Sequence, residues 1–293
     1  MLAEFDLVMP GDLAQALDIL AGEGGGDAGT LPLAGGTNLV VDLRAKRVSA
    51  DRLVGLGRID ALRGIARRND RIAIGGGTTL SDILRDPGMA EAAPSLVESA
   101  RVFAGQMVRN TATVAGNICC GSPAADTVPP LLALDAELTL TSSGGARVVP
   151  LADFFLGYQE DRRRPDELVT EIAWDAPPPG AANLFYKLAR RKGDAITVVG
   201  VAVTVAAEAG KCSRARIALG AVAPIVKRAR GAEALLEGQA PTPELIEAAA
   251  QRAVEESSPI DDVRASADYR RHAVHMLTRR LVTQAWDRAT GGV

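Results

Sequence analysis

The sequence predicts an α+β protein of two domains, a larger one over residues 1–176 and a smaller one over residues 177–293. In the first part, short apolar segments alternate with glycine-rich turns and helix starts, which is typical of mixed strands and helices. The run from Pro177 to Gly180, with three consecutive prolines, is the clearest linker in the chain. With 293 residues, 47% of them hydrophobic, the chain can bury one large core or two moderate ones.

Caps and turns define the first elements. Asp12 is placed to cap a helix over residues 13–20, whose apolar positions recur at helical spacing, and the glycine-rich run 22–26 ends it. An apolar strand over residues 30–34 then leads through a glycine turn into a second helix start, together residues 35–43. Because a strand, a glycine turn and a helix start follow one another here, this turn is the first candidate binding element in the chain.

The same order of strand, glycine turn and helix start recurs further along the chain. Strands are expected at residues 52–55 and 71–74, and the second ends in three glycines before a short helix opens at residues 78–82. Residues 89–106 have the composition of a helix that Pro94 breaks or kinks.

Alternating and continuous apolar runs predict the remaining strands. Residues 136–141 alternate apolar and polar side chains, and a Ser-Ser-Gly-Gly turn separates them from residues 147–149, which predicts an antiparallel hairpin. Residues 168–174 form a further strand. A second hairpin is expected from residues 196–207 and 214–221, which flank a Gly-Lys turn.

Two helices are expected after the second hairpin. The first begins with Thr242 as N-cap and Pro243 at the first helical position, and it extends through Glu255. The second begins near Ser266. One face of this second helix is expected to carry Tyr269, Ala273, Met276, Leu277 and Leu281.

Composition excludes several classes of function. The formal net charge of -3 lacks the basic excess that nucleic-acid binding needs, so no nucleic-acid partner is expected. Acidic residues interrupt the N-terminal segment, so it does not resemble a secretory signal, and no apolar run approaches the ~20 residues that span a bilayer. A cytoplasmic protein without direct membrane insertion is expected. The dinucleotide motif GxGxxG is absent from the candidate binding regions, residues 35–38, 75–78 and 103–126, and the P-loop, serine-hydrolase GxSxG and zinc HExxH motifs are absent from the sequence.

The cysteines and histidines give little sign of a metal site. Cys119, Cys120 and Cys212 have no zinc-ligand spacing. The adjacent pair at 119–120 allows a strained disulfide or a redox pair, but small buried thiols are the favoured interpretation. His272 and His275 lie three residues apart on one predicted helix, and two ligands make an incomplete site, so they are expected to be solvated.

Glycine turns and polar loops are the candidate binding elements. The turn 35–38 brings backbone amides and a helix N-terminus together, which suits a phosphate group. The glycines at 75–77 have the same chemistry, but tight packing between crossing elements is the favoured interpretation. The segment 103–126 is rich in groups that bind phosphate oxygens, amides and sugar hydroxyls, and it also fits an ordinary polar loop. The basic cluster Lys187, Arg190, Arg191 and Lys192 is interpreted as a solvated face.

Several motifs together resemble a known family. They are LAGGTNL at residues 33–39, FAG at 103–105, VAGN at 114–117 and SPAAD at 122–126. In this order they resemble the FAD subunit of the xanthine dehydrogenase family, which includes carbon monoxide dehydrogenase and related molybdenum hydroxylases. The match continues through residues 154–158, 166–168, 185–187 and 266–270, and covers nearly the whole chain.

The resemblance implies a fold and a set of site residues. The N-terminal domain would be the bipartite FAD-binding domain of the vanillyl-alcohol oxidase (PCMH) type, with subdomains of about residues 1–57 and 58–176, followed by a smaller α+β domain like the C-terminal domain of carbon monoxide dehydrogenase flavoproteins. Residues 34–39 and 113–117 would be the two pyrophosphate-binding turns, and Asp126 would contact the sugar. The cofactor-binding residues so assigned are Leu33, Ala34, Gly35, Gly36, Thr37, Asn38, Leu39, Phe103, Thr113, Val114, Ala115, Gly116, Asn117, Asp126, Val169 and Lys187.

One position departs from the family pattern. Many relatives have a glycine pair where this chain has Ala115-Gly116, so the extra methyl group is expected to shift the second turn slightly. FAD binding is still expected. It is expected to be noncovalent, because the predicted FAD domain contains no histidine for a covalent link.

The resemblance also implies partners. The substrate would react at a molybdenum pterin centre on a large subunit, and electrons would pass through two [2Fe-2S] clusters on a small subunit to FAD on this chain, in a dimer of heterotrimers. Three cysteines in this spacing cannot hold those clusters, so the clusters would lie on the partner. A branch with an additional [4Fe-4S] insertion is disfavoured, since the chain shows no cysteine-bearing insertion.

Two alternatives stay open from the sequence. One is a stand-alone FAD-dependent oxidoreductase of the same fold, which would need a catalytic acid or base near the flavin; the sequence identifies none. The other is a nucleotide-binding assembly module without a redox role. The sequence selects neither an organic substrate nor an electron acceptor.

Overall fold

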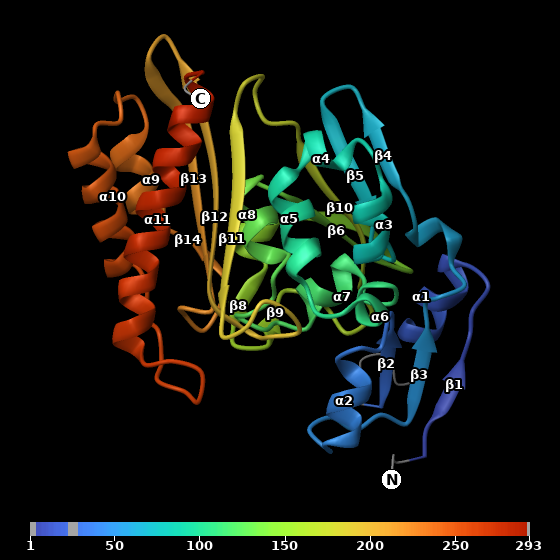
Figure 1. Cartoon of the computed structure of the whole chain (residues 1–293). Helices are drawn as coiled ribbons and strands as arrows, with labels where there is room; N and C mark the ends of the chain where they lie inside the picture. The colour runs from blue at the N-terminus through green and yellow to red at the C-terminus, as the bar shows by residue number, and fades with distance from the viewer. Residues whose placement is uncertain (1–3, 23–28, 292–293) are drawn as a thin grey trace.

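The structure is a computed structural model that describes residues 4–22 and 29–291. It has a mixed α and β fold, in which strands of the described residues form two larger antiparallel sheets, a small parallel sheet and a short two-stranded ribbon (Figure 1). The glycines at 24–26, expected to follow the first helix, lie outside the described residues. No helix in the described part of the chain is long and apolar enough to cross a bilayer.

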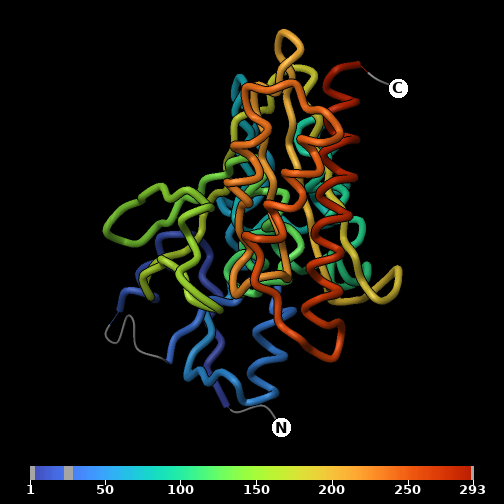
Figure 2. The backbone as a smooth tube through the Cα atoms, turned by 90° about the vertical axis from the view of Figure 1, so that its left-hand side faces the viewer, coloured from blue at the N-terminus to red at the C-terminus, as the bar shows by residue number. Residues whose placement is uncertain are grey.

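The first predicted turn, at residues 35–38, follows a strand of the small parallel sheet. The order of this sheet is β1 (Asp6–Val8), β3 (Arg52–Gly55) and β2 (Thr30–Leu33), with α1 (Leu13–Ala21) and α2 (Leu39–Arg44) beside it. The carboxylate of Asp12 accepts a hydrogen bond from the backbone N–H of Gln15 at 2.9 Å, which confirms the predicted cap. Figure 2 shows this sheet at one end of the molecule, on the side where the described chain begins.

The five-stranded antiparallel sheet forms the centre of the first part of the chain. Its order is β4 (Ile65–Arg68), β5 (Arg71–Gly75), β10 (Leu168–Asp175), β6 (Glu137–Ser142) and β7 (Gly145–Pro150). β10 therefore lies between strands that precede it by many residues. The predicted hairpin is confirmed, because β6 and β7 pair in antiparallel register.

Short helices and turns connect these strands. In chain order they are η1 (Asp60–Leu62), α3 (Leu80–Arg85), α4 (Met89–Ala92), α5 (Pro94–Val102), α6 (Gln106–Arg109), α7 (Val114–Cys119), α8 (Val128–Ala133) and η2 (Leu151–Asp153), and the ribbon is β8 (Phe155–Gly157) with β9 (Glu160–Asp161). α5 and α8 lie between the five-stranded sheet and the next sheet (Figure 1).

The four-stranded sheet is covered on both faces. Its order is β11 (Ala182–Ala189), β12 (Thr197–Glu208), β13 (Lys211–Gly220) and β14 (Lys227–Arg228). One face contacts α5 and α8, and the other contacts α9 (Arg230–Leu236) and α11 (Ala267–Ala289), against which α10 (Pro243–Glu255) packs. Because both faces of the sheet are covered, β12 is buried at every position from Thr197 to Ala206. Its sequence is correspondingly a nearly continuous apolar run.

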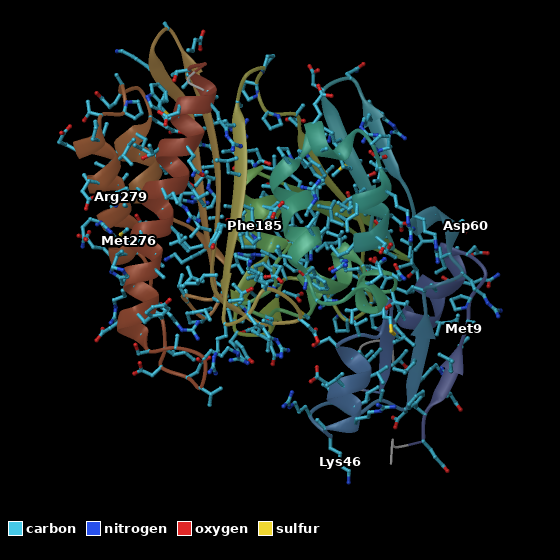
Figure 3. The ribbon with its side chains drawn as sticks, in the orientation of Figure 1. Met9, Lys46, Asp60, Phe185, Met276 and Arg279 are labelled. Atoms are coloured by element: carbon cyan, nitrogen blue, oxygen red, sulfur yellow. The ribbon has the colours of Figure 1, made fainter. Side chains whose placement is uncertain are left out.

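Side chains of β11 point alternately to these two layers. Phe185 is buried with the core of the first part of the chain, and Figure 3 places it between β11 and the α5–α8 layer. Leu184 and Leu188 pack instead with the core under α11. The four-stranded sheet therefore lies between two cores, and Met276 and Arg279 lie on α11, on the other side of the sheet from α5 (Figure 3).

Several expectations about elements were wrong. The helix expected over residues 89–106 is broken at Pro94 as predicted, since Pro94 stands at the first position of α5, but α5 ends at Val102 instead of reaching residue 106. Residues 114–119 form helix α7 instead of a turn. β4, β11 and α9 were not expected from the residue pattern.

The predicted face of the last helix was wrong in part. Ala273, Leu277 and Leu281 are buried, but Tyr269 and Met276 are 51% and 39% exposed. A row of residues four apart drifts by about 40° per step around an α-helix, so its first member turns away from the sheet.

Candidate functional site

The two predicted binding turns meet through their backbones. Gly36 has φ +67, in the left-handed region, and ends the turn that leads into α2. A Cβ atom on Gly35 would lie 1.9 Å from the carbonyl oxygen of Thr111, just before the second turn. A Cβ on Gly116 would lie 3.9 Å from the Cβ of Ala34. Gly35 is therefore required by close approach of two backbones, and the starts of α2 and α7 lie side by side.

The second turn begins with a capped helix. Thr113 is the N-cap of α7, and its hydroxyl accepts a hydrogen bond from the N–H of Gly116 at 3.0 Å. Thr113 also bridges to Thr79, and the N–H of Val114 donates to the carbonyl of Thr78 at 3.0 Å. Thr78 belongs to the second candidate turn, residues 75–78, whereas Thr79 was not singled out from the sequence; its position directly after that turn was the available signal.

A third close approach joins β5, β10 and α7. A Cβ on Gly76 would lie 2.1 Å from the carbonyl oxygen of Val169 and 3.4 Å from the Cβ of Ala115. A Cβ on Gly75 would lie 2.3 Å from the carbonyl oxygen of Leu62. The tight-packing interpretation of these glycines is confirmed. The methyl group of Ala115 lies against Gly76, so that glycine leaves room for it.

Asn117 connects the second turn to the segment that carries Asp126. Its side-chain carbonyl oxygen accepts hydrogen bonds from the backbone N–H of Thr127 at 3.1 Å and from the Thr127 hydroxyl at 2.7 Å. The hydroxyl of Ser99, on α5, donates to the carbonyl of Asp126 at 2.8 Å. The second turn, Asp126 and α5 are thus fixed relative to one another.

Asp126 forms a buried ion pair with Lys187. The Nζ atom of Lys187 lies 2.6 Å from Oδ2 of Asp126, and their side chains are 5% and 8% exposed. The hydroxyl of Thr197 donates to the other carboxylate oxygen. Burial raises the pKa of the Asp126 carboxyl, and the positive charge of Lys187 opposes that change. Thr197 was not identified from the sequence, because it stands near the beginning of a largely apolar run that predicts a strand.

Lys187 received two interpretations from the sequence, and the solvated one is wrong. Its side chain is buried because β11 is covered by α5 on the face where Lys187 points, whereas Arg190, Arg191 and Lys192 beyond the strand are exposed. Nζ of Lys187 also donates to the carbonyl of Val102 at 3.3 Å, directly before Phe103. Phe103, Asp126 and Lys187, 61 residues from Asp126, therefore meet at the C-terminal end of α5.

Two predicted residues of the first turn lie at the surface, whereas Leu33 and Leu39 are partly buried. Thr37 and Asn38 are exposed, and the side-chain amide of Asn38 donates to Asp42 at 3.0 Å. Because the first amides of a helix have no partner within it, helix starts offer donors for an anionic group. At the start of α7, however, Thr78 and Thr113 already accept from the amides of Val114 and Gly116. The arrangement suits an elongated dinucleotide, with its diphosphate at the two turns.

The cysteines and histidines show no redox or metal arrangement. All three thiols are free, and burial raises the pKa of Cys119 to about 11. His272 is exposed, and Nε2 of His275 lies 2.7 Å from a carboxylate oxygen of Glu247. Over residues 4–22 and 29–291, no group of three or more His, Cys, Asp or Glu residues is arranged to hold a metal ion.

Comparison with protein families identifies two matching regions. Residues 3–174 match the family described as the FAD binding domain in molybdopterin dehydrogenase. Residues 184–285 match the CO dehydrogenase flavoprotein C-terminal domain.

Individual relatives match over nearly the full length. The carbon monoxide dehydrogenase medium chain of Hydrogenophaga pseudoflava is 33% identical over 284 residues, covering 97% of this chain and 98% of that protein. The putative xanthine dehydrogenase FAD-binding subunit of Escherichia coli (strain K12) is 30% identical and covers 88% of this chain and 89% of its own length.

Solved structures agree with these matches. A structure of the Hydrogenophaga pseudoflava carbon monoxide dehydrogenase, lacking the Mo-pyranopterin moiety of its cofactor, superposes with a TM-score of 0.94 at 32% identity, covering 98% of this chain and 99% of that one. Quinoline 2-oxidoreductase from Pseudomonas putida 86 gives a TM-score of 0.90 at 28% identity, covering 99% of both chains.

Proposed function

This chain belongs to the FAD-binding medium subunits of the xanthine dehydrogenase and carbon monoxide dehydrogenase family of molybdenum hydroxylases, and we propose that it relays electrons within such a complex. In this proposal the chain passes electrons from [2Fe-2S] clusters of a partner subunit to an external acceptor. It is an oxidoreductase subunit, and the organic substrate is transformed on another chain.

One observation carries the proposal: two glycine turns, far apart in the sequence, meet so closely that Gly35 contacts the backbone of Thr111. Each turn leads into a helix start, and the paired starts supply amides and partial positive charge to a diphosphate. Gly36, with φ +67, shapes the first turn, and the Thr113 hydroxyl holds the second. The residues present fit FAD.

We assign further contacts along the site. The backbones of residues 33–39 and 113–117 would hold the diphosphate, and Asp126 with Lys187 would form the wall next to the sugar. Phe103 and Val169 would contact the rings. FAD, when bound, supplies a group that accepts electrons singly and releases them in pairs.

The domain assignment is also part of the proposal. We propose a PCMH-type FAD-binding domain over residues 1–176, divided near residue 57, and a C-terminal domain over residues 177–293. The ends of the two family matches, at residues 174 and 184, support a boundary between them. FAD would lie where the parallel sheet meets the rest of the first domain.

The proposed partners are a molybdenum-pterin large subunit and a [2Fe-2S] small subunit, in a dimer of heterotrimers. The names of relatives, such as the medium chain of carbon monoxide dehydrogenase, support a complex of several chains. Three cysteines cannot ligate two [2Fe-2S] clusters, which favours placing the clusters elsewhere. The three free thiols fit a reducing, cytoplasmic compartment.

The test is purification of the chain alone and with co-expressed neighbouring subunits, followed by flavin spectra and metal analysis. We expect the lone chain to bind FAD without metal, and the complex to add molybdenum and iron and to bleach its flavin when substrate is added. A lone chain that turns over a substrate with its own flavin and recruits no metal-containing partner would replace the relay with a stand-alone oxidoreductase.

A further inference from the structure

The loop between α5 and α6 has an unusual backbone at the candidate site. Phe103, Ala104 and Gly105 separate the two helices. Ala104 has φ +35, on the left-handed side that alanine rarely adopts. Such a conformation costs free energy and persists only where surrounding contacts hold it.

Two cationic side chains hold this loop by three consecutive carbonyl groups. Lys187 donates to the carbonyl of Val102 at 3.3 Å. Nη1 of Arg109 donates to the carbonyls of Phe103 and Ala104, each at 2.8 Å. Because α5 ends at Val102, these cations also lie at the negative end of its helix dipole.

Arg109 also stands at the start of the second binding turn. It is the last residue of α6, two positions before Thr111, whose carbonyl packs against Gly35. The next residue, Asn110, accepts a hydrogen bond from the Ser81 hydroxyl at 2.6 Å. The backbone of Arg109 is thus part of the segment that shapes the diphosphate site, while its side chain reaches back to Phe103.

The hydrogen-bond partners of Arg109 are all uncharged. Besides the two carbonyls, Nη2 donates to the side-chain oxygen of Gln106 at 3.2 Å. Its Nε atom is buried and has no hydrogen-bond partner within the described part of the chain. A buried donor without a partner costs stability, but Arg214 and Arg270 share this feature, so the distinctive feature of Arg109 is its contact with the 103–105 loop.

We propose that Arg109 is a positioning residue of the cofactor site, whose planar guanidinium fixes the strained 103–105 loop so that Phe103 forms one wall of the FAD pocket. This inference rests on the proposed function. Nη1 donates to both loop carbonyls while Nη2 donates to Gln106, and the single nitrogen of a lysine ammonium does not reproduce this planar arrangement of two donor nitrogens.

The experiment titrates FAD into the full chain, freed of flavin, and follows flavin fluorescence for wild type, Arg109→Lys and Arg109→Met. The lysine variant keeps the positive charge but has one donor nitrogen in place of the planar guanidinium. The methionine variant has neither the charge nor the donors. We expect both variants to raise the Kd for FAD about tenfold, the equivalent of one lost charge-assisted hydrogen bond. Arg101→Lys is the matched control, because Arg101 is exposed and, among the described residues, its ion pair is with Glu98 on its own helix; its Kd should equal that of wild type.

A double-mutant cycle separates positioning from general damage. If Arg109 acts through the loop, Arg109→Lys should raise the Kd little further in a Phe103→Ala background, and the flavin-free variants should melt close to their parents. Wild-type affinity in Arg109→Lys, or an undiminished effect of Arg109→Lys in the Phe103→Ala background, overturns the positioning role alone. A wild-type chain that binds no FAD overturns the proposed function and this role together.

Discussion

The turns around the candidate site and the four-stranded sheet are stabilised in different ways. At the site, Gly35, Gly75 and Gly76 bring backbone against backbone at distances that no side chain would allow. In the sheet, β12 is buried over ten consecutive positions, Thr197–Ala206, and its side chains pack against helices on both faces. The first region depends on shape at single positions, and the second on apolar area.

This difference shows where function resides in the molecule. Backbone amides exposed by glycine turns are suited to an anionic cofactor, whereas the C-terminal sheet reaches the site through only a few side chains, chiefly Lys187 and Thr197. A second ionic contact joins the regions away from the site: Asp135 meets Arg214 at 2.6 Å, Arg216 at 2.7 Å, and Arg228. Charged pairs thus link two regions that are otherwise stabilised differently.

The largest expected effect comes from breaking the link at the site. Lys187→Met leaves the Asp126 carboxylate buried without its cation, which should cost about 3–5 kcal/mol of unfolding free energy. Arg71→Met, at an exposed contact with Asp175 of 3.1 Å, should cost about 0–1 kcal/mol. Urea unfolding of both variants measures the difference, and equal losses would mean that the Lys187 pair contributes no more than a surface contact.

A smaller effect is expected from filling one backbone contact. In Gly35→Ala the new methyl group would lie 1.9 Å from the Thr111 carbonyl oxygen, so the two turns must separate. We expect a loss of about 1–3 kcal/mol and a larger proportional loss of FAD affinity. Gly57→Ala is the control, since nothing lies within 4 Å of a Cβ there, and it should change stability by less than about 0.5 kcal/mol. FAD affinity that survives Gly35→Ala would show that the turns bind independently.

Local signals in the sequence were sufficient for single caps and turns in both parts of the chain. The Asp12 cap, the glycine turn ending at Gly36 and the Thr242 cap each depend on neighbouring residues only, and the structure confirms them. Strand β4 has three of its four residues exposed, so no apolar pattern marked it. Helix α7 has six residues and begins in a threonine-rich segment that also reads as a turn.

Contacts between distant residues could not be predicted from local pattern. The pairing of Lys187 with Asp126 spans 61 residues, and the sequence pattern gave Lys187 the appearance of a solvated residue because it precedes three exposed basic ones. Arg109 likewise lacked any local sign of its return to Phe103. The burial of one face of β11 by α5 decides such cases, and it follows only from the assembled fold.

Acid should weaken both regions through specific carboxylates. The hydrogen bond from Arg147 holds the pKa of Glu167 below its ordinary value. For Asp262, burial acts to raise the pKa, but hydrogen bonds from Arg264 and Arg270 outweigh it and lower the pKa. A lowered pKa in the folded state means stability that is present above the ordinary pKa and is lost as the pH falls towards the lowered value.

Two variants separate these acid effects. Urea midpoints should fall less between about pH 7 and about pH 3 in Glu167→Gln and in Asp262→Asn than in wild type, because neither variant has that carboxylate to protonate. Glu171→Gln, at an exposed position of β10, is the control and should lose as much as wild type. If the urea midpoint of Glu167→Gln falls in acid as much as that of wild type, the pair of Glu167 with Arg147 does not contribute to the acid sensitivity of the first region.

The smallest perturbation uses the thiols as reporters of the two regions. Burial raises the pKa of Cys119, near the site, and of Cys212, in the four-stranded sheet, to about 11. Relative to the ordinary value of 9.0, the thiolate fraction at neutral pH is about a hundredfold smaller, so both should react slowly with a thiol reagent in the folded chain. With rising urea, Cys119 should become reactive before Cys212, because turns that depend on single contacts open more easily than a sheet buried on both faces. Simultaneous labelling would show that the two regions unfold as one cooperative unit, and rapid labelling of Cys119 without urea would place its thiol in a far more accessible environment than the fold provides.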